Sequence, residues 1–307
     1  MRTTVIACLG LVACAAASGP PATSWTKGEA AVPGTIRPGL PDAALHVRGG
    51  DVKPAPALYE NAVALGEKKA AAPARDIATL GLISGAHIAF GGFLAVTIGA
   101  NMPAMASSNP GLQKLIFGLF GLPFGLYMVL AAGGELFTGN TALVTAALIE
   151  GKATLTGLLK NWSVSYVGNL IGSLAIVKLV SAAGLVATPA VGGIATKKCS
   201  LPFFETFLRG VVCNWMVCMA VWVATGASNL VEKYLAMLLP VTAFVAFGAE
   251  HSVANMFLIP LGMDAGASVS WMDFFVKNLL PVTLGNIVGG AVCQTGLYSA
   301  VYGSLLK

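Results

Sequence analysis

Six long apolar stretches alternate with the polar segments of the chain. They cover about residues 77–100, 115–149, 162–185, 203–225, 234–259 and 279–305. A helix needs roughly 20 apolar residues to cross a hydrocarbon layer about 30 Å thick, and each stretch reaches that length. The second stretch is too long for one straight helix. The pattern predicts an all-α, polytopic membrane protein with six transmembrane helices.

The first 76 residues lack this pattern and divide into three parts. Residues 1–17 have the form of a signal peptide, because a basic residue precedes an apolar run that ends in the small residues Ala15–Ala17. A short N-terminal anchor is the alternative. Residues 18–56 are rich in Pro and Ala without a hydrophobic period, so we expect a disordered segment, which could belong to a transit sequence. Residues 57–76 predict an amphipathic helix at the membrane surface, before a transmembrane domain over residues 77–307.

Charged residues are scarce and unevenly distributed. Only 10% of the 307 residues are charged and 56% are hydrophobic, against about 25% and 45–50% in soluble domains. Of the 31 charged residues, 14 precede residue 77 and 17 are spread over the next 231. So few charges cannot cover a soluble enzyme, and no basic run exceeds two residues, which argues against nucleic-acid binding. The six cysteines form no Cys-x-x-Cys pair, so we expect no metal site.

The two halves of the membrane region match each other. Each contains Gly-x-Glu with an asparagine five residues after the glutamate. The first half has Glu135 and Asn140, and the second has Glu250 and Asn255, which stand 115 residues further on. A Lys-Asn pair followed by Gly-Asn recurs 117 residues later, at 160–172 and 277–289. Two matches at nearly one offset indicate an internal repeat.

The repeat predicts how the halves are arranged. The units span about 77–187 and 202–305 and hold three helices each, and an odd number of spans means that the halves are inverted. A carboxylate inside an apolar stretch costs several kcal/mol unless it faces protein or water. Irregular backbone at membrane depth is tolerated only beside protein or a cavity. We therefore expect broken second and fifth helices that meet at a solute site near the middle of the membrane.

A histidine stands in the second matched segment. His251 directly follows Glu250, and an intramembrane histidine is a functional candidate because its ring exchanges a proton near neutral pH. The two glutamates suit a different role, since a carboxylate repels an anion. We expect Glu135 and Glu250 to hold loop backbone N–H groups, with Asn140 and Asn255 as further loop-structuring residues.

Four segments resemble the formate/nitrite transporter family. Gly133–Gly139 is similar to the family's first signature, and Gly210–Ala220 to its second, with Met219 in place of the more usual Leu or Val. Phe247–Phe257 resembles the segment around the family's central histidine, and Pro281–Asn286 its last-helix motif.

This resemblance covers roughly Pro54 to Tyr302. It implies an aquaporin-like protomer of six helices, assembled as a homopentamer with one pore per protomer. It also implies permeants that are small monovalent anions of weak acids: nitrite, formate, and in some members bicarbonate, hydrosulfide or lactate. An aquaporin itself would need an Asn-Pro-Ala turn in each half, and neither half has one.

Residue roles along the pore are implied by the same resemblance. It places Thr138 opposite His251, Lys198 in a vestibule, and Asn214 on the fourth helix beside the substrate pathway. It implies apolar constrictions on either side of the histidine at Leu122, Leu126, Leu136, Phe137 and Phe244. We expect no catalytic residue, metal or cofactor.

Together these roles predict transport of nitrite or formate past a central histidine, coupled to protons. The vestibule lysine draws in the anion, which then crosses as the neutral acid or transiently paired with a His251 proton, because an apolar passage strongly disfavours a bare anion. Bicarbonate or another small anion is the alternative permeant. A membrane enzyme built on Glu250 and His251 would lack a nucleophile, a metal cluster and a cofactor motif.

Basic residues in the loops predict the orientation. Seven are expected on one side, namely Lys68, Lys69, Arg75, Lys152, Lys160, Lys233 and Lys307. Four are expected on the other, namely Lys114, Lys197, Lys198 and Lys277. Both mature termini should therefore face the cytoplasm or an equivalent compartment.

The leader is compatible with two target membranes, the plastid envelope and the plasma membrane. A fluorescent fusion of residues 1–76, imaged in cells that contain plastids, should label one of them, because a signal followed by a transit-like stretch suits plastid import and a plain signal suits secretion. Plastid import would favour nitrite, which plants and algae reduce there. Diffuse cytosolic fluorescence would contradict both.

Overall fold

The computed structural model describes residues 53–186 and 190–307, and all regular secondary structure in them is helical. The predicted leader, nearly all of the Pro- and Ala-rich segment, and residue 187, the expected end of the first repeat, lie outside the described residues. Six helical runs are long and apolar enough to cross a membrane, namely Ala74–Asn101, Pro110–Ala131, Leu155–Ala182, Phe203–Ala224, Leu230–Phe247 and Asp273–Tyr302. The predicted all-α membrane fold is confirmed.

Each half contains short helices besides the spans. The first half consists of α2 (Ala55–Ala71), α3 (Ala74–Ile98), η2 (Gly99–Asn101), α4 (Pro103–Ser108), α5 (Pro110–Leu119), α6 (Leu122–Ala131), α7 (Phe137–Ile149) and α8 (Leu155–Ala182). The second consists of α9 (Ala190–Cys199), α10 (Phe203–Ala224), α11 (Leu230–Phe247), α12 (Ser252–Asp264), η3 (Asp273–Leu279), α13 (Leu280–Ile287), η4 (Val288–Gly296) and α14 (Leu297–Tyr302). The last span is continuous, with η3 and η4 as π-helical segments.

Helix ends follow ordinary local rules. The side chain of Thr154 caps α8 by accepting from Gly157 N–H, and that of Asn229 caps α11. Prolines stand in the first turns of α4, α5 and α6, where a missing N–H costs nothing. The second and fifth apolar stretches are broken as predicted, into α5, α6 and α7 and into α11 and α12. The short helix α9 was not predicted from the sequence.

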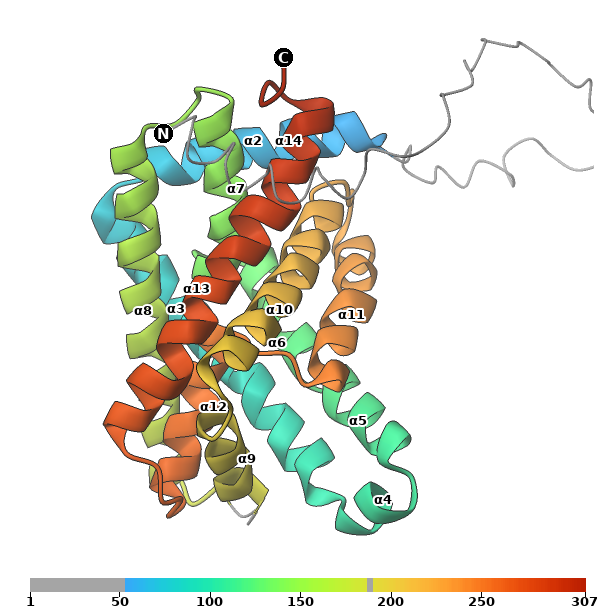
Figure 1. The fold of residues 1–307 in the computed structure, drawn as a ribbon, viewed down its shortest axis with the longest axis vertical. Coiled ribbons are helices and arrows are strands. Elements are labelled where there is room, and N and C mark those ends of the chain that lie inside the picture. The colour runs from blue at the N-terminus through green and yellow to red at the C-terminus, as the bar shows by residue number, and fades with distance from the viewer. Residues whose placement is uncertain (1–52, 187–189) are drawn as a thin grey trace, which may run out of the picture. The chain divides into compact units, whose positions relative to one another are not determined.

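The helix α2 and the C-terminal end lie at the same end of the bundle (Figure 1), and a carboxylate joins them. Glu150, after α7, accepts hydrogen bonds from Tyr59 Oη at 2.6 Å, Ser299 Oγ at 3.1 Å and Ser304 N–H at 3.0 Å. Burial raises the pKa of this carboxyl, but the three hydrogen bonds outweigh burial and hold its pKa below the usual value. The junction keeps α2 across the ends of the spans.

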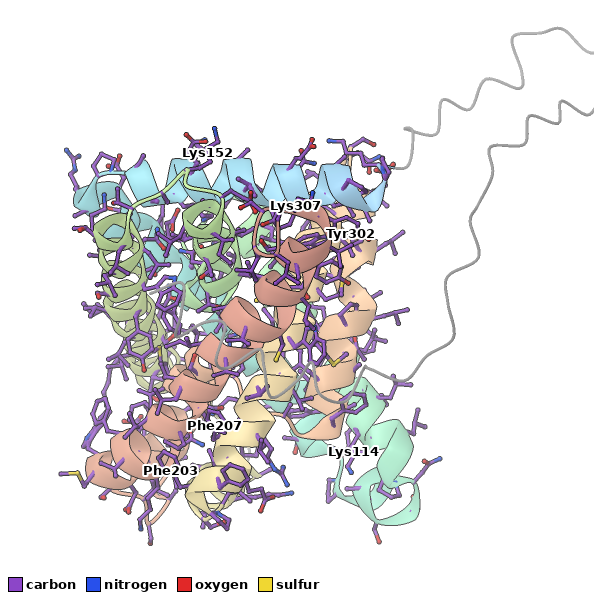
Figure 2. All side chains as sticks on the ribbon, turned by 45° about the horizontal axis from the view of Figure 1, so that its top comes forward. Lys114, Lys152, Phe203, Phe207, Tyr302 and Lys307 are labelled. Atoms are coloured by element: carbon purple, nitrogen blue, oxygen red, sulfur yellow. The ribbon has the colours of Figure 1, made fainter. Side chains whose placement is uncertain are left out.

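Lysines mark both ends of the bundle. Lys152 and Lys307 lie at the end that carries α2, and Lys114 lies at the opposite end, as Figure 2 shows. Large apolar side chains are exposed between and beside them, among them Leu239, Phe204 and Met272. Such surface suits lipid or a neighbouring subunit rather than water.

Glycines allow two pairs of spans to approach closely. A Cβ on Gly168 in α8 would stand 3.0 Å from the Ala78 oxygen and the Leu82 nitrogen of α3, and one on Gly172 would overlap the Leu82 carbonyl. In the second half, a Cβ on Gly285 of α13 would lie 3.0 Å from the Cα of Gly210 in α10. Small residues at helix contacts are typical of membrane bundles.

We expect Gly172→Ala to lower the melting temperature, because overpacking a close helix contact typically costs about 1–3 kcal/mol. A thiol-reactive dye can follow unfolding, since Cys199, Cys213 and Cys218 are free and buried. Gly193→Ala is the matched control, because its Cβ would meet nothing within 4 Å. Equal melting temperatures for the two variants would contradict the packing argument.

Candidate functional site

Two non-helical loops interrupt the spans at matched points of the halves. Residues 132–136 separate α6 from α7, and residues 248–251 separate α11 from α12. Gly133 and Gly248 turn the chain in the left-handed region, with φ of 70° and 74°, a conformation that glycine adopts without strain. Each loop leads into a half-helix of 13 residues, α7 or α12.

The first loop is held by a group of polar side chains that we call the first clamp. Glu135 Oε1 accepts a hydrogen bond from Lys69 Nζ at 2.9 Å. Asn140 and Asn161 donate to Glu135 Oε2 at 2.6 and 2.9 Å. Asn140 also donates to Asn161 Oδ1 at 2.9 Å, and Asn161 to the Lys69 carbonyl at 3.1 Å. The carboxylate thus has a countercharge and two further donors, and burial of a charge requires such partners.

The second clamp repeats these contacts in the other half. Both carboxylate oxygens of Glu250 accept from Lys198 Nζ at 3.0 Å. Asn255 and Asn278 donate to Glu250 Oε2 at 2.6 and 3.2 Å. Asn255 donates to Asn278 Oδ1 at 2.8 Å, and Asn278 to the Lys198 carbonyl at 2.9 Å. The match extends the repeat to α2 and α9, which supply the two lysines.

A second amide in each half satisfies the loop backbone. Asn169 accepts from Phe137 N–H at 2.9 Å and donates to the Gly81 and Glu135 carbonyls at 2.8 and 2.9 Å. Asn286 does the same in the second half, through Ser252 N–H at 2.9 Å and the Gly210 and Glu250 carbonyls at 2.9 and 3.0 Å. Backbone freed from helices at this depth therefore keeps its hydrogen bonds.

The clamps correct one expectation. The carboxylates of Glu135 and Glu250 bind lysine and asparagine side chains, not loop N–H groups. Asn140 and Asn255 contact these glutamates from the first turns of α7 and α12.

Sequence reasoning counted Lys69 only toward the orientation, and it assigned no role to the four asparagines that complete the clamps and hold the loop backbone. The asparagines, Asn161, Asn169, Asn278 and Asn286, were nevertheless visible in the 117-residue match. Buried amides at repeated points of apolar stretches are the signal that identifies them, because a buried polar group needs a partner.

Lys198 lines a cavity beside His251, where the resemblance places the vestibule, but it is ion-paired there. Its ammonium binds both oxygens of Glu250, and its side chain is 17% exposed against 4% for the glutamate. The pair is close to neutral, so Lys198 adds little net charge to the cavity that it lines.

His251 and Thr138 meet across the two halves. His251 Nε2 lies 3.1 Å from Thr138 Oγ1, and both residues are buried. His251 Nδ1 accepts from Ala254 N–H at 3.0 Å and caps α12. A nitrogen that accepts carries no proton, so this bond selects the neutral tautomer with the proton on Nε2. The ring then donates to Thr138, whose hydroxyl proton is left to donate elsewhere.

Asn214 lies behind this pair instead of beside a cavity. Its amide donates to the Thr138 carbonyl at 3.1 Å, to Thr141 Oγ1 at 2.9 Å and to the Asn286 carbonyl at 2.6 Å. It lines none of the three cavities described below. Thr138 lines none of them either, so Asn214 holds the two halves together behind Thr138 and its place beside the substrate pathway stays a prediction.

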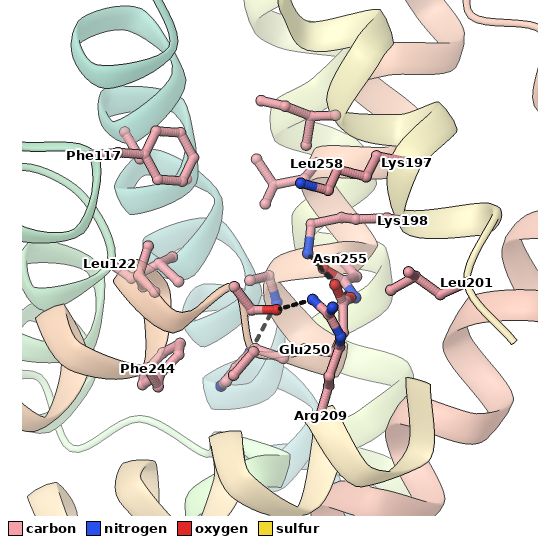
Figure 3. Close-up of a pocket in the computed structure, with 18 residues that line it drawn as sticks. Phe117, Leu122, Lys197, Lys198, Leu201, Arg209, Phe244, Glu250, Asn255 and Leu258 are labelled. Atoms are coloured by element: carbon pink, nitrogen blue, oxygen red, sulfur yellow. Dashed lines mark hydrogen bonds and ion pairs between the residues drawn. The ribbon is translucent and has the colours of Figure 1, made fainter. Parts of the chain in front are cut away.

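Three cavities reach the site from both ends. The α9-side cavity, about 170 Å³, has Lys197, Lys198, Arg209, Glu250 and His251 in its lining (Figure 3). The α2-side cavity, about 730 Å³, has Lys68, Lys69, Asp76, Lys233 and Glu135 in its lining. A space of about 10 Å³ between apolar side chains and His251 is the central cavity.

Apolar side chains separate these cavities. Leu122 and Phe244 line both the α9-side and the central cavity, and Leu126 lines the central one. Phe244 stacks on His251 with ring centroids 5.9 Å apart. On the other side, Val217 of the central cavity and Val221 of the α2-side cavity are one helical turn apart on α10.

Two expected constriction residues lie elsewhere. Leu136 is buried and lines none of the three cavities. Phe137 packs edge-on against Tyr166 and Trp162, with centroids 4.8 and 6.2 Å away, and lines a lateral groove beside α8 and α13. The loop break turns Phe137 toward α8, an effect that helical periodicity does not reveal.

The described residues do not form a metal-binding group. Within 53–186 and 190–307, no three His, Cys, Asp or Glu side chains group so that they could hold a metal ion.

Comparison with known proteins points to one family. The model of the formate/nitrite transporter family matches residues 56–300. A protein named probable formate transporter, from Methanothermobacter thermautotrophicus, is 42% identical over 258 residues, covering 78% of this chain and 93% of that protein. The formate channel FocA of Haemophilus influenzae is 38% identical over 239 residues, covering 69% of this chain and 82% of FocA.

Solved structures show the same likeness. A chain described as an FNT family ion channel superposes with a TM-score of 0.70 at 30% identity, covering 80% of this chain and 98% of that one. Another, described as a pentameric formate channel with formate bound, has a TM-score of 0.66 at 31% identity, covering 75% and 98%.

The second clamp yields a stability prediction. Glu250→Gln leaves the Lys198 ammonium buried without a countercharge, a change that typically costs about 3–5 kcal/mol. We expect a large drop in melting temperature and partial recovery when Lys198→Met is added, because the second change removes the unpaired charge. Asp264→Asn is the control, since its partner Lys178 is 76% exposed and such pairs contribute about 0–1 kcal/mol. Equal drops for Glu250→Gln and Asp264→Asn would contradict this account.

Proposed function

The chain belongs to the formate/nitrite transporter family, and from that membership we propose that it carries formate across a membrane together with a proton, past His251. It is a multi-pass transport protein and not an enzyme, as the family and its relatives named formate channels establish. Formate is preferred because the most similar relatives described above carry that name. Nitrite, a planar anion of similar size, is the second candidate for the same site.

The proposed path runs through the three cavities in order. An anion enters the α9-side cavity, passes Leu122 and Phe244, meets His251, and leaves along α10, from Val217 to Val221, into the α2-side cavity. Narrow apolar rings exclude hydrated ions and can close by expelling water. The observation that supports this path best is the His251–Thr138 hydrogen bond, because His251 lines both the α9-side and the central cavity.

The hydrogen bonds favour passage as the neutral acid. A bare anion loses its hydration in the apolar passage at a large free-energy cost, and protonation removes most of that cost. His251 would have to carry a proton on Nδ1 to act as a cation, and that proton would face Ala254 N–H, which now donates to Nδ1. We therefore propose that His251 stays neutral as a hydrogen-bonding partner, and that the proton crosses on the permeant.

Assembly and orientation complete the proposal. A homopentamer is supported by the structure described as a pentameric formate channel and by the exposed apolar side chains of the described spans. The end that carries α2 and the C-terminus is proposed to face the cytoplasm or an equivalent compartment, because it holds more lysine and arginine. The plastid envelope and the plasma membrane remain the two proposed locations.

In proteoliposomes, we expect His251→Asn to lower formate uptake at least about tenfold, because the Nε2–H donor beside Thr138 is lost. The pH dependence of the remaining uptake should stay that of wild type, because the proton crosses on the permeant. His87→Asn is the matched control, since His87 lies in α3 outside the clamps and cavities, and its uptake should stay within about twofold. Wild-type uptake in His251→Asn would refute the hydrogen-bonding role given to His251, and a changed pH dependence would refute its neutrality.

A further inference from the structure

Arg209 on α10 lines the α9-side cavity and has no part in the function proposed above. Its Nη1 donates to the Gly248 carbonyl at 2.9 Å, and its Nε and Nη2 donate to Glu205 Oε1 at 3.0 and 2.7 Å. The guanidinium thus reaches from α10 to the loop that carries His251 (Figure 3).

The inverted repeat shows that this side chain is particular to the second half. Glu250 N–H donates to the Arg209 carbonyl at 3.3 Å, and Glu135 N–H donates to the Leu80 carbonyl at 3.4 Å. Arg209 and Leu80 are therefore matched positions. The backbone contact works equally well with leucine, so the clamp alone does not require an arginine at this place.

The basic side chains that line the α9-side cavity differ in how accessible they are to a bound anion. Lys198 is tied to Glu250 in a buried pair. Arg209 and its partner Glu205 are 34% and 46% exposed, and such exposed pairs contribute about 0–1 kcal/mol. Lys197 is exposed and presents only a point charge. Arg209 is thus the accessible residue of the lining with a fixed planar array of donors.

Some N–H groups of the Arg209 guanidinium have no partner among the described residues. A guanidinium carries five N–H groups, and three of those on Arg209 have partners among the described residues. The two that remain belong to Nη1 and Nη2, which are also the pair that binds a carboxylate side by side.

We propose that Arg209 is the docking residue for planar oxyanions in the α9-side cavity. Its two terminal nitrogens bind both oxygens of formate or nitrite before the anion reaches Leu122 and Phe244. Lys198 serves the clamp, and Arg209 gives this mouth its affinity for the carboxylate shape. The proposal rests on the proposed transport of such anions.

The test is the concentration dependence of initial formate uptake in proteoliposomes. Arg209→Leu copies the matched residue of the first half and should raise the half-saturating formate concentration about tenfold, with the maximal rate within about twofold of wild type. Arg209→Lys keeps the charge but loses the paired donors, so it should raise the half-saturating concentration nearly as much. Lys114→Leu removes a charge at the same end of the bundle, outside the cavity lining, and should match wild type.

Other outcomes overturn the proposal. Wild-type half-saturation in Arg209→Lys would show that a positive field suffices, without shape recognition. A lower maximal rate at unchanged half-saturation in both variants would show that Arg209 only holds the Gly248 loop. If Arg209→Leu does not fold, Arg209→Lys decides alone. Absence of formate uptake by wild-type protein would instead defeat the proposed function, so the two failures are distinguishable.

Discussion

Where a helix breaks inside a membrane region, its free backbone groups need hydrogen-bond partners and its charged side chains need a countercharge. This constraint organises the whole structure. Unpaired peptide groups in hydrocarbon cost several kcal/mol each. The protein meets the constraint twice with one chemical solution, a carboxylate neutralised by a lysine and surrounded by amides. Each clamp joins four segments of its half, so the short helices α2 and α9 are as necessary as the spans that they touch.

The same solution brings two helix ends to one place. The half-helices α7 and α12 begin directly after the clamped loops, and Thr138 and His251 stand at these beginnings. The N-terminus of a helix carries a partial positive charge that favours anions and electronegative atoms. Such a field attracts a small oxyanion without a full ionic bond that would hold it. A centre of this kind suits rapid passage better than a buried ammonium would.

Much of this was visible in the sequence, for a physical reason. A glutamate within an apolar stretch must have partners, so Glu135, Glu250 and their common offset predicted broken helices and inverted halves. The partners themselves were harder to find, because Lys69 belongs to a short polar helix with no membrane-like period. The resemblance placed Lys198 at a vestibule but could not show that Glu250 neutralises it. The direction of Phe137 depends on the backbone turn of a loop, which residue spacing does not encode.

The repeat also separates scaffold from chemistry. Positions that match in both halves build the clamps, whereas His251 and Thr138, whose matched positions hold other residues, form the polar contact between the halves. His251 corresponds to Leu136 at the 115-residue offset, and Thr138 therefore faces a ring that its own half lacks. A symmetric pore would present two identical groups, two donors or two apolar side chains. One ring and one hydroxyl instead form a donor–acceptor pair, which suits a small acid that both donates and accepts. The clamps are alike in the two halves, and the residues that differ between the halves, His251 and Thr138, make the centre asymmetric.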